Sequence, residues 1–196
     1  MGKKLLFILP CILSVFVSPA FSGPRKIQFG LTAGPAFTYF DNSATGASGN
    51  KTGYSMGMFM NIPKKESASG GRVEMLITSK GAVTGAPETT IDLTYLEIPV
   101  KYRLMFGEKN TGFGVEAGFG IGFNLSATAE TGGEEMDIRD SVAATDLGLV
   151  GGFFYEGNRL SVSFGYNLGF MDVFPEDAKN TTRNMALYTM LSYKFQ

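Results

Sequence analysis

The sequence GFGVEAGFGIGFNLS, residues 112–126, alternates between two kinds of side chain. Every odd-numbered residue is apolar, and every even-numbered residue is a glycine, Glu116, Asn124 or Ser126. Successive side chains of a β-strand point to opposite faces, so the segment predicts a strand with one apolar and one small, polar face. Its five glycines disfavour a helix, because each would cost roughly 1 kcal/mol relative to alanine. The segment is also long enough for a strand that crosses a membrane, which needs ~9–11 residues.

The same alternation recurs along the chain and predicts eight strands. They cover residues 27–39, 53–62, 72–78, 94–104, 112–126, 146–155, 160–169 and 185–195. Longer connections at 41–51, 80–90, 127–141 and 171–182 alternate with shorter ones, as the outer loops and periplasmic turns of outer-membrane barrels do. We therefore predict an all-β fold, an eight-stranded antiparallel up-and-down transmembrane β-barrel. Pro99 lies inside a predicted strand and predicts a local bulge there.

The first 22 residues have the pattern of an export signal. Lys3 and Lys4 precede an apolar stretch at 5–17, and the small residues Ala20 and Ser22 follow. We expect a signal peptide at 1–22 and an outer-membrane β-barrel domain at 23–196. Beyond the signal no run of 18 apolar residues occurs, so no transmembrane helix is predicted.

Composition excludes several kinds of function. The chain has no histidine, and its only cysteine, Cys11, lies within the expected signal. Catalysis by Ser-His or Cys-His pairs and metal binding by histidine or cysteine are therefore excluded. A formal net charge of −1, without a basic run, gives no reason to expect nucleic acid. We expect no catalytic residues, no metal site and no cofactor, and hence not an enzyme.

Charged residues decide which face of the predicted strands points inward. The following charged residues all share the glycine-rich face: Arg72, Glu74, Glu97, Lys101, Arg103, Glu116, Asp146 and Lys194. A soluble lipocalin-like barrel would place its polar face outward and its apolar face around a ligand. Small residues on the polar face instead suit the crowded interior of a narrow membrane barrel. We predict that these eight groups form a charge network in the lumen, although a small conducting pore lined by the same residues remains an alternative.

Three short motifs resemble one family. Residues 95–102 (YLEIPVKY) resemble a motif of the porin-family outer-membrane β-barrel domain, which includes PorT-like proteins, and residues 30–34 (GLTAG) resemble its first strand. The resemblance implies an eight-stranded barrel of the OmpA type that does not necessarily conduct. Tyr193 and Phe195 resemble the terminal aromatic signal that the barrel-assembly machinery recognises.

These observations lead to one expected function and two alternatives. We expect a non-enzymatic integral protein of the bacterial outer membrane, a monomer in contact with outer-membrane lipid and lipopolysaccharide, with a structural role or a role in loop-mediated interactions. The first alternative is a narrow porin for small solutes or ions, and the second is a soluble periplasmic binding barrel. The acidic segment 127–141 is interpreted as a solvated surface loop, with a partner or divalent cations as the competing hypothesis.

Overall fold

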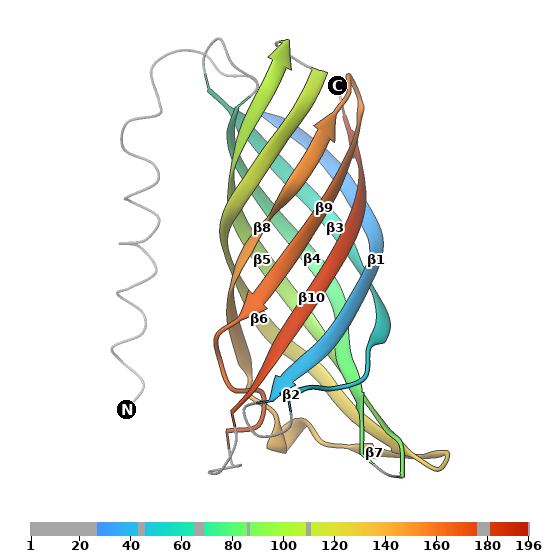
Figure 1. The fold of residues 1–196 in the computed structure, drawn as a ribbon. Helices are drawn as coiled ribbons and strands as arrows, with labels where there is room; N and C mark the ends of the chain where they lie inside the picture. The colour runs from blue at the N-terminus through green and yellow to red at the C-terminus, as the bar shows by residue number, and fades with distance from the viewer. Residues whose placement is uncertain are drawn as a thin grey trace.

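The computed structural model describes residues 27–42, 46–64, 69–85, 87–108, 111–175 and 181–195. The expected signal peptide at 1–22 lies outside these residues. Eight long antiparallel strands form a closed ring (Figure 1). They are β1 (Gln28–Asn42), β3 (Lys51–Pro63), β4 (Gly70–Thr84), β5 (Thr89–Glu108), β6 (Thr111–Thr131), β8 (Thr145–Glu156), β9 (Leu160–Gly169) and β10 (Thr182–Lys194). The predicted fold class is confirmed, since β10 pairs with β1 and closes the sheet.

The pairing register sets the tilt of the strands. A row of facing residues begins at Gln28, passes once around the ring and returns to β1 at Thr38, ten residues further along. With strands ~4.8 Å apart and a rise of ~3.3 Å per residue, this stagger gives a tilt of about 40°. An eight-stranded barrel of this tilt encloses a space that side chains can fill.

The two ends of the barrel differ. The loop end carries the connections at 43–50, 85–88, 132–144 and 170–181, together with β2 (Gly46–Ala47), β7 (Glu134–Asp137) and the short 3-10 helix η2 (Arg139–Ser141). The turn end carries the connections at 64–69, 109–110 and 157–159. The first and last strands meet at the turn end, where the Phe195 amide donates to the Phe29 carbonyl at 2.8 Å. Figure 1 shows β2 and β7 at the bottom and the C-terminal end at the top.

Two connections predicted as loops are largely strand. The segment 80–90 is a tight hairpin, because β4 continues to Thr84 and β5 begins at Thr89. In the segment 127–141, β6 continues to Thr131 and turns back through Gly132 and Gly133 into β7. Both glycines have positive φ, 61° and 89°, which suits a two-residue hairpin turn.

The bulge predicted at Pro99 is wrong. Pro99 pairs with Gly120 of β6. On the side of β4 two residue pairs are missing at Pro99, but the register between β4 and β5 is the same before and after this gap. Pro35 behaves in the same way: it pairs with Tyr54 of β3, and two residue pairs towards β10 are missing. The actual register shift lies between β5 and β6 at Thr94/Tyr95. Each proline thus interrupts pairing on one side only, and the ring stays closed.

The wall has an apolar outer face and a polar inner face. Exposed aromatic and aliphatic side chains cover the outside, and charged residues that face outward, such as Asp41 and Arg183, lie near the loop end. Phe59, which interrupts the polar pattern of its strand, points into the lumen and is buried. No helix in the described part of the chain is long and apolar enough to span a membrane.

Neighbouring glycines in β8 test this two-sided wall. A Cβ atom on Gly152 would overlap the backbone of Phe164 and Gly165, whereas one on Gly151 would meet only the Glu116 carbonyl oxygen, at 3.5 Å. We expect Gly152→Ala to lower the free energy of unfolding by about 1–3 kcal/mol through overpacking. Gly151→Ala should leave the free energy of unfolding unchanged or slightly higher. Urea unfolding of both variants in lipid vesicles checks this, and equal effects would contradict it.

Candidate functional site in the barrel lumen

The structure places all eight charged residues singled out from the sequence on the inner face of the barrel. Ion pairs connect them with two residues that the sequence reading had placed in connections, Lys80 and Glu156. Lys80 had been placed in a loop and Glu156 in a turn, yet both lie at inward positions near strand ends and are buried. The lumen therefore holds five cations and five anions of these ten residues, and their formal charges cancel.

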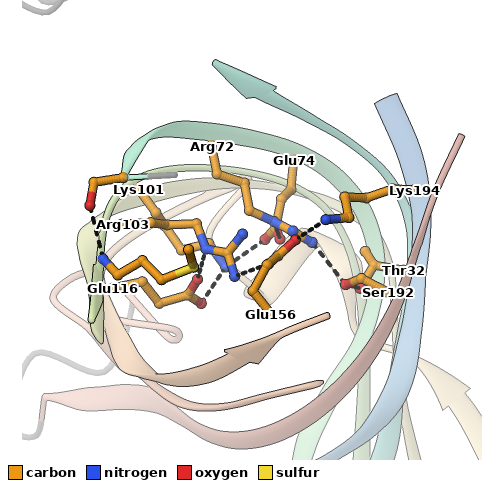
Figure 2. A network of polar contacts seen from close by, with 11 residues as sticks. Thr32, Arg72, Glu74, Lys101, Arg103, Glu116, Glu156, Ser192 and Lys194 are labelled. Carbon is orange, nitrogen blue, oxygen red and sulfur yellow. Dashed lines mark hydrogen bonds and ion pairs between the residues drawn. The ribbon is translucent and has the colours of Figure 1, made fainter. Parts of the chain in front are cut away.

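Seven of these side chains form one continuous chain in the turn-end half of the barrel (Figure 2). Cations and anions alternate along it. The order is Arg72, Glu74, Lys101, Glu116, Arg103, Glu156 and Lys194, with N···O distances between 2.5 and 3.1 Å. Each glutamate bridges two cations, one through each carboxylate oxygen. All seven side chains are at most 7% exposed.

Neutral groups hold the two ends of the seven-residue chain. Arg72 donates to the Ser192 hydroxyl at 2.9 Å, and Ser192 in turn shares a hydrogen bond of 2.8 Å with Thr32. At the other end Lys194 donates to the Gly157 carbonyl at 2.9 Å. A buried charge is tolerated best when it is paired and hydrogen-bonded. Every charge of the seven-residue chain has an ion-pair partner, whereas the Nε of Arg103 and the Oε2 of Glu156 lack a hydrogen bond to any described residue.

A second, smaller cluster lies nearer the loop end. Lys80 is 1% exposed and pairs with Glu97 at 2.5 Å and with Asp146 at 3.3 Å. Asn184 donates to Asp146 at 3.1 Å and to the Tyr95 hydroxyl at 3.3 Å. This cluster has one cation and two anions, whereas the seven-residue chain has four cations and three anions. The net negative charge of the cluster therefore balances the net positive charge of the chain.

Aromatic rings on the inner wall lie over glycines of the adjacent strand. Three cross-strand pairs show this arrangement: Gly30 with Phe59, Gly114 with Phe154, and Gly165 with Tyr188. A side chain on any of these glycines would occupy the space of the ring. The open ring faces then carry three of the four cations of the seven-residue chain, Arg72, Lys101 and Arg103, a favourable cation–π arrangement.

The guanidinium groups give the clearest case. Arg72 lies 3.7 Å from the centre of the Phe59 ring, and Arg103 lies 3.7 Å from that of Phe154. Both stacks have the same three layers, namely glycine, ring and guanidinium. Glycine on the inner face therefore allows the aromatic ring to lie flat, and the flat ring fixes the plane of the arginine.

Between the two clusters the lumen contains a small cavity of about 30 Å³. Its lining includes Glu74 and Lys101 from one cluster, Lys80 and Glu97 from the other, and the ring of Tyr188. This volume suits a few water molecules, each of which needs ~10–15 Å³. It is too small for an organic ligand, for which pockets of roughly 300–1,000 Å³ are usual.

An apolar cluster lies at the loop end of the lumen. Its buried members are Phe40, Ala82, Leu93, Tyr95, Ala127, Val142 and Val173. The β6–β8 and β9–β10 loops supply two of these, and the Ala143 amide donates to the Val173 carbonyl at 2.9 Å and links the two loops. The ring of Phe174 packs edge-on against Phe40, with ring centres 5.8 Å apart. We call these residues the mouth cluster.

Other sequence-predicted features lie outside the lumen. Tyr193 and Phe195, the residues of the predicted assembly signal, point outward at the turn end with ring centres 6.1 Å apart. Among the described residues, no group of three or more acidic or cysteine side chains could hold a metal ion. The acidic segment 127–141 extends from the loop end, with all four residues of β7 exposed.

Arg103, which bridges two glutamates of the seven-residue chain, offers a test of these buried pairs. Arg103→Ala leaves Glu116 with Lys101 and Glu156 with Lys194, so we expect a loss near the lower end of the 3–5 kcal/mol typical of a broken buried pair. The matched variant Lys51→Ala breaks a pair whose partner, Asp92, is 46% exposed, and should cost about 0–1 kcal/mol. Urea unfolding measures the loss of stability in both variants. A larger loss for Lys51→Ala than for Arg103→Ala would contradict the conclusion that the buried ion pairs matter more for stability.

Comparison with known proteins agrees with this architecture. The solved structure of Neisserial surface protein A is similar with a TM-score of 0.60 and 18% identity, and the match covers 85% of this chain and 97% of that one. Ail, the attachment invasion locus protein of Yersinia pestis, is similar with a TM-score of 0.54 and 13% identity over 86% of this chain and 98% of that one. No curated protein sequence matches the chain. The family model for the outer membrane protein beta-barrel domain matches residues 18–175, and the chain therefore belongs to this family of bacterial outer-membrane barrels.

Proposed function

We propose that this protein is a non-enzymatic outer-membrane barrel whose lumen is a structural core and whose loop end contacts partners outside the cell. The observation that supports this most strongly is the self-neutralised lumen. Its ten charged side chains pair with one another, and the mouth cluster covers them at the loop end. Charged groups that pair with one another favour a structural role, and the buried Tyr188 hydroxyl beside the cavity is a polar group there without a hydrogen-bond partner among the described residues.

Membership of the family supports the orientation used in this proposal. Short turns of outer-membrane barrels face the periplasm and longer loops face outward. The turn end would then be periplasmic and the loop end extracellular. In this proposal residues 1–22 direct export, and Tyr193 and Phe195 present the barrel to the assembly machinery. The apolar outer wall would contact lipid and lipopolysaccharide, an environment that a soluble periplasmic barrel would not have.

Charge favours a cationic partner at the loop end. Exposed carboxylates at this end outnumber exposed cations in the described part of the chain; they are Asp41, Glu88, Glu130, Glu134, Glu135, Asp137 and Asp140, against Arg139 and Arg183. Ail has been solved in complex with the heparin analogue sucrose octasulfate, at 12% identity to this chain and a TM-score of 0.51. A polyanion of that kind does not complement this acidic surface, so we expect a different class of partner here.

A narrow porin is the second candidate, and the cavity in the middle of the lumen is the observation in its favour. A closed lumen predicts that the purified protein produces no steady current in planar lipid bilayers at physiological salt. Arg103→Ala should also produce none, because the mouth cluster and the Lys80 cluster remain. Reproducible unitary currents in the unaltered protein that change in size with Arg103→Ala would contradict the proposal and favour the porin.

A further inference from the structure

At the loop end the barrel wall continues beyond the β6–β8 pairing as a four-stranded sheet. The last residue pair between β6 and β8 joins Phe123 to Thr145, and beyond it β6 pairs with β7 instead. On its other side β6 remains paired with β5 as far as Thr89. Figure 1 shows this part projecting away from the barrel axis at β7. We call it the sheet extension, formed by 80–84, 89–93, 127–131 and 134–137.

The sheet extension ends in an open strand edge. Within the described residues β7 pairs with β6 alone, so its second side has no neighbouring strand. The Ile138 amide donates to the Ala127 carbonyl at 3.0 Å, which fixes the alternation of the antiparallel ladder. By that alternation, the backbone N–H and C=O groups of Glu135 and Asp137 point away from β6, towards the open edge.

One face of this extension concentrates negative charge. Glu130 and Glu135 are directly opposite each other in a pair without mutual backbone hydrogen bonds, the closer of the two pair types. Asp137 follows Glu135 on the same face, and no ion pair to these three carboxylates occurs in the described part of the chain. Like charges directly opposite each other destabilise a strand pair, so a cation beside Glu135 would relieve this repulsion.

The opposite face of the extension carries an apolar row, with the Thr131–Glu134 pair beside it at the hairpin turn. Met136 is 68% exposed and pairs with Ala129, which in turn pairs with Ile91, a residue packed against the mouth cluster. An apolar row thus runs from the mouth cluster to solvent and ends at Met136. A strand added beside β7 would extend both faces at once, the acidic one and the apolar one.

We propose that the open edge of β7 binds an extended polypeptide segment of a partner in which basic and apolar residues alternate. In an added strand the residues opposite Glu135 and Asp137 would exchange backbone hydrogen bonds with them and share their acidic face. Lysine or arginine at these positions complements the carboxylates, and the apolar residues between them cover Met136. This inference deepens the proposed loop-mediated role and rests on it.

The test uses the full-length mature barrel in nanodiscs and a labelled nine-residue peptide that alternates lysine and valine, with binding measured by fluorescence anisotropy. N-methylation of the lysine amides removes the donors that face β7, whereas N-methylation of the valine amides removes those that face solvent. We expect the first modification to weaken binding by at least ~10-fold, and the second by less than ~2-fold, because only the first blocks strand addition.

A pair of matched protein variants separates the edge from general charge attraction. Glu135→Lys and Glu88→Lys make the same change at exposed glutamates of the loop end, but Glu88 lies in the β4–β5 turn, away from the open edge. Glu135→Lys should weaken binding by about 10-fold and Glu88→Lys by less than ~2-fold. Equal losses in the two variants, or equal binding of the two methylated peptides, would overturn the proposal. No binding of the unmodified peptide to a folded, non-conducting barrel would reject the β7 edge and leave the proposed closed barrel intact.

Discussion

Ring closure between β1 and β10 is the constraint on which the rest of the structure depends. In a membrane every backbone N–H and C=O group must be paired within the protein, and only a closed sheet achieves this with strands. Once the ring is closed, each strand has one face towards lipid and one towards a narrow lumen. Charged side chains within the wall can then lie only in the lumen, where they must pair with one another. Pro35 and Pro99 are compatible with the closed ring, because each loses residue pairs with only one of its two neighbouring strands.

Glycine makes this crowded interior possible. Inward glycines leave room for the rings of Phe59, Phe154 and Tyr188 to lie against the wall, and two of those rings support arginines of the seven-residue chain. The alternation of glycine with apolar residues in 112–126 is therefore one pattern with two consequences. The apolar residues form the lipid-facing surface, and the glycines create space for an ordered network of charges. A larger residue at Gly114 would displace the ring of Phe154, over which Arg103 lies.

The period-two pattern was enough to predict the fold, because a strand with two different faces leaves the same signature wherever it occurs. It also placed residues such as Arg103 and Glu116 on the inner face. It could not predict Lys80 or Glu156, because a strand that continues past the membrane loses its apolar face, and its ends then look like loops. The pattern also does not predict which inward residues lie close together in space. Glu156 pairs with Arg103 and Lys194 because the curved wall of the barrel brings their side chains together in the lumen. The sheet extension is not evident from the sequence either, since β7 has only four residues and Met136 is its single apolar one.

The central claim is that the chain forms a closed barrel in the outer membrane with its charges sealed inside. Gel mobility of unboiled and boiled outer-membrane fractions in SDS tests this claim most directly, because a closed sheet with a paired, buried lumen resists the detergent until it is heated. The account predicts a compact, faster-running band that disappears on boiling and is confined to the outer-membrane fraction. A single band of unchanged mobility, recovered in the soluble periplasmic fraction, would contradict it.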